Sequence, residues 1–159
     1  MTKRARLWLL ALGPILWLGC LYPADDDYAE SSDYVVEDAW LSGDLPDVGR
    51  FDADAYEVEL GWDEVTLHAG RDGGDDFGWA MTRLALSVDE LAEMEGTQDG
   101  GWATGCSGPR HGSWDWDDST SDVQVTVSPG PAAGERLVHF VADFGGGQRS
   151  EGGFIVRPR

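Results

Sequence analysis

Short runs in which apolar and polar residues alternate, separated by glycine-rich turns, constrain the fold of this chain more than any other feature. In residues 55–60, Tyr56, Val58 and Leu60 alternate with two glutamates. A period of two is typical of a β-strand with one buried face. A glycine-containing turn leads into a second alternating run at 65–68, so the sequence predicts a β-hairpin with one buried face and one acidic face.

Further strands are predicted along the rest of the chain. Residues 77–86 are apolar enough for a buried strand, valines alternate with polar residues at 123–127, and apolar residues dominate 137–144 and 154–156. A first short element is expected at 34–41. Strands at this spacing, joined by glycine-rich turns, favour an antiparallel β-sandwich or a barrel-like domain.

Three stretches depart from the strand pattern. Ser87, with Glu90 three residues later, has the signature of a helix N-terminus, and Gly96 would end that helix after two turns or so. Residues 96–113 and 145–153 are rich in glycine, so we expect an irregular segment and a loop there. The predicted fold class is therefore all-β with one short helix.

The first 20 residues have the pattern of an export signal. A basic start at residues 3–6 precedes an apolar run of 12 residues at 7–18, which is short for a membrane span, and Leu18, Gly19 and Cys20 follow. This arrangement resembles a bacterial lipoprotein signal. The resemblance implies cleavage before Cys20, acylation of that cysteine with palmitate-like chains, and anchoring in the cell envelope, with the outer membrane favoured because leucine rather than aspartate follows the cysteine.

Two alternatives to the lipid anchor stay open, namely an uncleaved N-terminal anchor and simple secretion. Cys20 and Cys106 are the two cysteines of the chain. An acylated Cys20 leaves Cys106 without an intrachain partner, whereas an unmodified Cys20 allows a Cys20–Cys106 disulfide. The predicted organisation is a signal peptide at 1–19, an acidic flexible tether at 20–33 and one β-rich domain at 34–159.

The exported part of the chain is strongly acidic. All 30 acidic residues lie after residue 19 and three of the 11 basic residues lie before it, so 30 acids stand against 8 bases and the formal charge is −22. This balance argues against nucleic acid as a partner and against charge-driven binding to anionic lipid headgroups. It is compatible with a solvated surface, with divalent cations or with a basic protein partner.

The most unusual local sequence runs from Trp114 to Asp118. In an extended strand, Trp114 and Trp116 would point one way and Asp115 and Asp117 the other. Indole rings can stack on sugars and carboxylates can bond hydroxyl groups, so the segment is a candidate carbohydrate site. The alternative is that the indoles are core anchors and the aspartates face water.

Other candidate sites are weaker. Asp72, Asp75 and Asp76 lie in a glycine-rich loop and are candidate calcium ligands, although the loop lacks the spacing and the closing glutamate of a calcium-binding hand. Cys106 and His111 are close in sequence, but a thiol nucleophile needs a base held within hydrogen-bond reach. The histidines share no metal-ligand spacing.

The sequence therefore favours a membrane-anchored envelope lipoprotein whose acidic β-domain is a non-catalytic binding or structural module. A carbohydrate-active protein, either binding or hydrolysing, is the alternative. No catalytic residue is predicted, and calcium is the one candidate cofactor.

Overall fold

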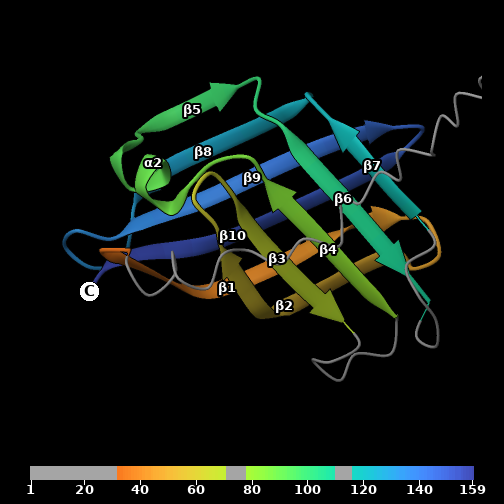
Figure 1. Ribbon diagram of the computed structural model, residues 1–159, viewed down its shortest axis with the longest axis horizontal. Helices are drawn as coiled ribbons and strands as arrows, with labels where there is room; N and C mark the ends of the chain where they lie inside the picture. The colour runs from red at the N-terminus through yellow and green to blue at the C-terminus, as the bar shows by residue number, and fades with distance from the viewer. Residues whose placement is uncertain (1–31, 71–77, 110–115) are drawn as a thin grey trace, which may run out of the picture.

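The computed structural model describes residues 32–70, 78–109 and 116–159. In this part of the chain, ten strands form one sheet in the spatial order β5-β8-β9-β10-β1-β2-β3-β4-β6-β7, and the neighbouring strands pair antiparallel (Figure 1). The elements are β1 (Tyr34–Leu45), β2 (Gly49–Leu60), β3 (Val65–Gly70), β4 (Trp79–Leu84), α2 (Val88–Glu93), β5 (Gly96–Asp99), β6 (Ala103–Gly108), β7 (Trp116–Thr120), β8 (Val123–Pro129), β9 (Arg136–Gly145) and β10 (Gln148–Pro158).

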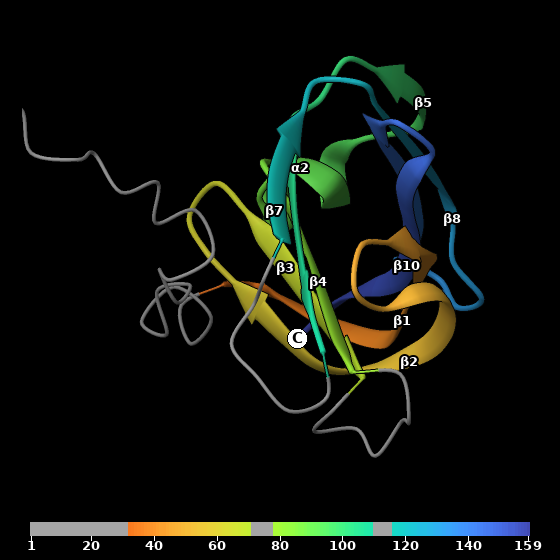
Figure 2. The same cartoon turned by 90° about the vertical axis from the view of Figure 1, so that its right-hand side faces the viewer.

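The sheet curls on itself, so that two walls face each other (Figure 2). Strand β2 belongs to both walls, because its residues 49–54 pair with β1 and its residues 55–60 pair with β3. The register shifts between Ala55 and Glu57, which marks a β-bulge at the change of partner. Bulges bend a strand and increase its twist. The expected antiparallel, barrel-like β-architecture with one short helix is confirmed.

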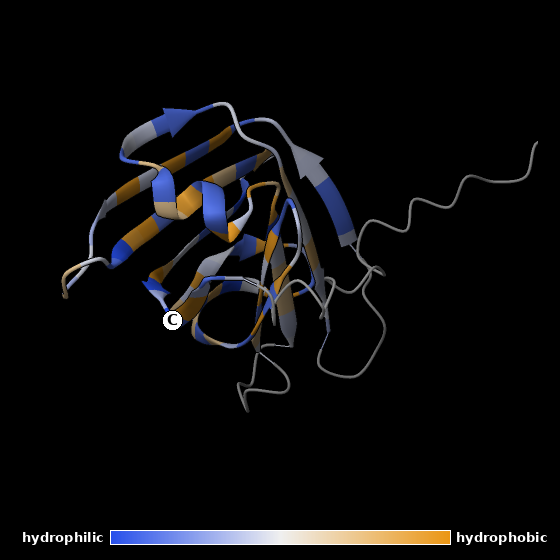
Figure 3. Cartoon of the chain, turned by 60° about the vertical axis from the view of Figure 1, so that its left-hand side comes forward, coloured by the Kyte–Doolittle hydropathy of each residue, from blue (hydrophilic) through white to orange (hydrophobic). Residues whose placement is uncertain are grey.

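The hydrophobic core fills the space between the walls. Apolar and polar bands alternate along the strands (Figure 3), and the apolar side chains point inward, as a period of two requires. Figure 2 shows α2 between the walls, where its buried Val88 and Leu91 join the core. The largest fully buried side chains are Phe140, Phe154, Leu41, Leu45, Leu67, Leu84, Leu91, Val65, Val88, Val125, Val127 and Val138.

Contacts between β7 and β9 draw the far ends of the walls together. The Thr120 hydroxyl donates to the Asp143 carbonyl at 2.6 Å, and the Asp143 amide donates to the Asp122 carbonyl at 3.0 Å. The rings of Trp116 and Phe144 pack edge to face with their centroids 5.3 Å apart, a favourable aromatic geometry. These contacts complete the curl on the side opposite to the β2 bend.

The predicted helix start is confirmed. The Ser87 hydroxyl accepts from the Glu90 amide at 3.2 Å, and the Glu90 carboxylate accepts from the Ser87 amide at 2.8 Å. This reciprocal capping box satisfies two backbone donors that the first turn leaves unpaired. The helix ends at Glu93. No helix of the described residues is long and apolar enough to cross a membrane.

The two glycine-rich stretches expected to be irregular instead contain strands β5, β6 and the first half of β10. Gly105 and Gly152 sit where aromatic rings press on the backbone. A Cβ atom would lie 2.6 Å from the Phe144 ring at Gly105 and 2.6 Å from the Phe140 ring at Gly152. Tertiary packing therefore requires glycine in these strands, although glycine has low intrinsic strand propensity.

The hairpin predicted at 55–68 is confirmed, with one correction. Residues Leu60 and Val65 close it, and the Gly61 amide donates to the Glu64 carbonyl at 2.8 Å. Tyr56 was expected to face inward with Val58 and Leu60, but it is exposed (38%). The bulge at this position adds one residue to β2 and interrupts the alternation, which sequence spacing alone does not reveal.

Replacing Phe140 by alanine is expected to lower the free energy of unfolding by about 3–5 kcal/mol, because the ring is fully buried and its loss leaves a cavity. Leu137→Ala on the same strand is the matched control, since Leu137 is 43% exposed and should cost well under half as much. Urea unfolding of both variants measures the difference. Equal losses in the two variants would contradict the assignment of Phe140 to the buried face of β9 and Leu137 to its exposed face.

Candidate functional site

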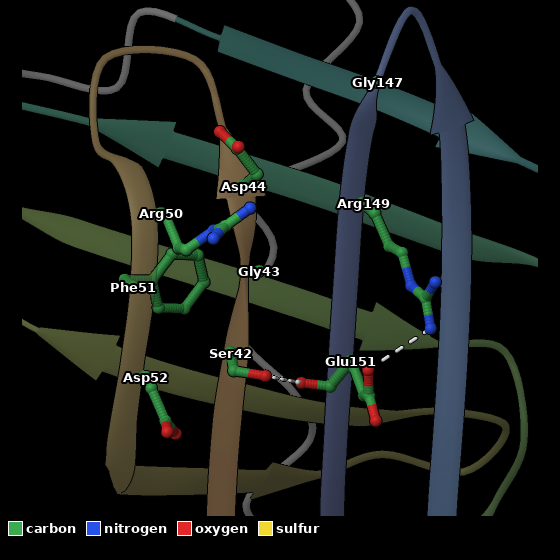
Figure 4. A pocket seen from close by; sticks show the side chains of 9 residues that line it. All are labelled: Ser42, Gly43, Asp44, Arg50, Phe51, Asp52, Gly147, Arg149 and Glu151. Carbon is green, nitrogen blue, oxygen red and sulfur yellow. Dashed lines mark hydrogen bonds and ion pairs between the residues drawn. The ribbon is translucent and has the colours of Figure 1, made fainter.

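An open groove of about 630 Å³ lies over β10, β1 and β2. Strand register places two rows of polar side chains across these strands, because residues opposite each other share one face. One row is Asp52, Ser42 and Glu151, and the neighbouring row is Arg50, Asp44 and Arg149 (Figure 4). The first row places a hydroxyl between two acids, and the second places an acid between two arginines.

The groove side chains are held by hydrogen bonds and ion pairs. The Ser42 hydroxyl donates to the backbone carbonyl of Glu151 at 3.5 Å. The Nη2 atom of Arg149 donates to the side-chain Oε2 of Glu151 at 3.2 Å (Figure 4). Glu151 Oε1 also lies 2.8 Å from Nε2 of His139 on β9. Glu151 therefore connects the groove to the neighbouring strand.

The described residues of the groove do not form the arrangement needed for nucleophilic catalysis. A serine nucleophile must donate its proton to a base that a third group orients. Here Ser42 donates to a backbone carbonyl, and Glu151 stands between the serine and His139. The order of the three groups is wrong for a Ser–His–acid relay, so the geometry fits binding by charged and hydroxyl groups.

The predicted tryptophan–aspartate segment is described only in part, because Trp114 and Asp115 lie outside the described residues. Trp116 is half-buried and packs against Phe144, whereas Asp117 and Asp118 are exposed. One indole of the segment therefore contributes to closing the sheet. Carbohydrate binding by the segment stays a prediction.

Large exposed aromatic side chains occur elsewhere in the described chain. Trp62, in the turn between β2 and β3, is 65% exposed, and Trp102, just before β6, is 51% exposed. Trp102 borders a hollow of about 440 Å³ together with Gln98 and Leu86. Sequence reasoning singled out neither residue, since a lone tryptophan in a loop gives no sign of whether it is buried.

The other predicted residues divide between described and undescribed parts of the chain. Asp72, Asp75, Asp76 and Cys20 lie outside the described residues, so the calcium and lipid-anchor predictions stay untested. Cys106 on β6 is fully buried and disulfide-bonded, which removes it as a thiol nucleophile in this state.

A second polar surface lies on the opposite side of the β2 bend, over β2, β3 and β4. It carries Glu57, Glu59 and His68, and next to them Arg83, whose Nε lies 3.4 Å from a Glu64 carboxylate oxygen. Burial raises the pKa of the Glu64 carboxyl above its ordinary value, and the Arg83 guanidinium offsets part of this effect. Cross-strand pairing assembles this surface, so no sequence motif marks it.

Replacing Glu64 by glutamine should therefore change stability in a pH-dependent way. Folding raises the pKa of the Glu64 carboxyl, so the native state holds this proton more tightly than the unfolded chain does. The carboxyl therefore lowers stability as the pH rises above its ordinary pKa. Urea unfolding should show Glu64→Gln gaining stability relative to the native protein as the pH rises above the ordinary pKa of a glutamate carboxyl. Glu37→Gln, which removes an exposed arginine-paired carboxylate, is the control. A stability difference that stays constant with pH would contradict this assignment.

Comparison of this chain with protein-family models, with curated proteins and with solved structures gives no match.

Proposed function

We propose that this protein is a non-catalytic binding module of the bacterial cell envelope, and that the groove over β10, β1 and β2 is its ligand-contacting surface. The observation that carries the proposal is the pair of charged rows in this groove. Its described residues offer binding groups of both signs and no nucleophile–base pair. Export to the envelope is supported by the signal-like residues 1–20.

The chemistry of the groove indicates the kind of ligand it takes. Arg50 and Arg149 offer donors to carboxylate or phosphate groups, and Asp44, Asp52 and Glu151 accept from ammonium or hydroxyl groups. Pockets for apolar small molecules are lined mainly by hydrophobic side chains. A polar ligand with charges of both signs, such as an exposed peptide segment or a charged glycan, is the better match.

The anchor is a separate part of the proposal, resting on Cys20 following Leu18 and Gly19. Several acyl chains on one cysteine would hold the domain firmly on a membrane. Cys106 is disulfide-bonded, and the chain has one other cysteine, Cys20. A cysteine sulfur that carries a lipid through a thioether bond cannot also form a disulfide. The disulfide-bonded state of Cys106 therefore weighs against the lipid anchor. Both states agree with export, since disulfides persist in oxidising compartments.

The groove assignment is tested by screening the exported chain against immobilised charged peptides and charged glycans. Arg149→Ala is expected to weaken binding of the best ligand about tenfold or more, because it removes charge-assisted hydrogen bonds. Arg157→Ala is the matched control, since it lies on the same strand outside the groove, is similarly exposed and also pairs with a glutamate.

Unchanged affinity in Arg149→Ala, or equal losses in the two variants, would contradict the groove as the binding surface. Conversion of any bound ligand to a product would contradict the non-catalytic assignment.

The anchor is tested by the intact mass of the protein purified from the membranes of a bacterial host. Acylation predicts the mass of residues 20–159 plus acyl groups, and a Cys106 thiol that reacts with alkylating reagent once the chain is unfolded. A bare chain lacking two hydrogen atoms and inert to alkylation before reduction would establish a Cys20–Cys106 disulfide and exclude the lipid anchor.

A further inference from the structure

Three metal-ligating side chains meet on the outer face of the β2–β3 hairpin. Glu57 lies directly opposite His68 in the strand register, and Glu59 lies diagonally across from it, opposite Thr66. Oxygen atoms of the two carboxylates and a ring nitrogen of His68 all lie within 4.8 Å of one another. The bulge at Tyr56 sets this arrangement, because it places Glu57 on the outer face although Ala55, two residues earlier, faces inward.

A buried ring nitrogen of His68 is an independent observation that points to a ligand at the same place. Nε2 of His68 is inaccessible to solvent and has no hydrogen-bond partner among the residues that the structure describes. On its other side the strand neighbour of His68 is Met81 of β4, a buried apolar residue that offers no strong acceptor or donor. Glu59 Oε1 lies 3.5 Å away, within ion-pair range, but the two atoms do not have the geometry of a hydrogen bond. A buried polar atom left in this state is costly unless another group satisfies it.

The spacing is suited to a small divalent cation. Zinc binds imidazole nitrogen and carboxylate oxygen at about 2.0–2.2 Å, so two ligands of a tetrahedral site lie about 3.3 Å apart. The observed 3.5 Å between His68 Nε2 and Glu59 Oε1 is close to that value. Two carboxylates neutralise the charge of the cation, and the imidazole favours zinc-like transition metals over calcium, which prefers six to eight oxygens.

We infer that Glu57, Glu59 and His68 form a binding site for a zinc-like divalent transition-metal ion on the hairpin surface. Three protein ligands leave a fourth coordination position to water or to a donor from another molecule. The paired strands hold the three ligands on a rigid scaffold. Glu57 is exposed, so the site is accessible to solvent on the side of this residue. The site does not depend on the groove, which lies on the other side of the β2 bend.

The test is calorimetric titration of zinc into the tag-free exported chain, with millimolar magnesium present to occupy surface carboxylates. One zinc ion per chain should bind, and its binding should raise the melting temperature. His68→Ala should weaken binding by more than about tenfold. His139→Ala is the matched control, because His139 also contacts a glutamate, Glu151 at 2.8 Å, on an outer strand face.

Glu57→Gln provides a second variant that keeps the fold, since this side chain is exposed, and it should also lose affinity. The visible spectrum of bound cobalt should change in both site variants and stay as in the native chain in His139→Ala and Arg149→Ala. Equal zinc affinity in the native chain, His68→Ala and Glu57→Gln would overturn the inference, as would several weak sites per chain that no single variant removes.

Discussion

Two aromatic rings pack directly against the backbone of glycine residues in the curled sheet. The Phe140 ring lies over Gly152 on the neighbouring strand, and the Phe144 ring reaches across to Gly105 on the opposite wall. A side chain at either glycine would force its ring away, and overpacking of this kind typically costs 1–3 kcal/mol. The close approach of ring and backbone at these two positions is therefore compatible only with glycine.

One bulge in β2 separates the two outer polar surfaces. Before the bulge, β2 contributes Arg50 and Asp52 to the groove, and after it the same strand contributes Glu57 and Glu59 to the hairpin cluster. A single long strand therefore supplies both sites, with its direction changed between them. Irregularities of this kind are common next to functional surfaces because they re-aim side chains without breaking the sheet.

The acidic surface contributes little to the stability of the fold. Ion pairs such as Arg149–Glu151 and Arg157–Glu37 join half-exposed side chains, and exposed pairs contribute at most about 1 kcal/mol. Burial of the large apolar side chains between the walls is the dominant favourable term. Stability therefore places little restriction on which charged residues occupy the outer face, so that binding or solubility can determine them. The inner face is restricted to side chains that fill the core.

Local pattern was sufficient to predict the hairpin at 55–68, the capping box at Ser87 and the alternating strands after residue 122, because each depends on residues that are neighbours in sequence. It was insufficient for the glycine-containing strands, the groove and the His68 cluster. Those features depend on which strands pair and in which register, and they bring together residues far apart in the chain. Only the packed core determines that register, because a slip of one residue would turn every buried side chain to the solvent.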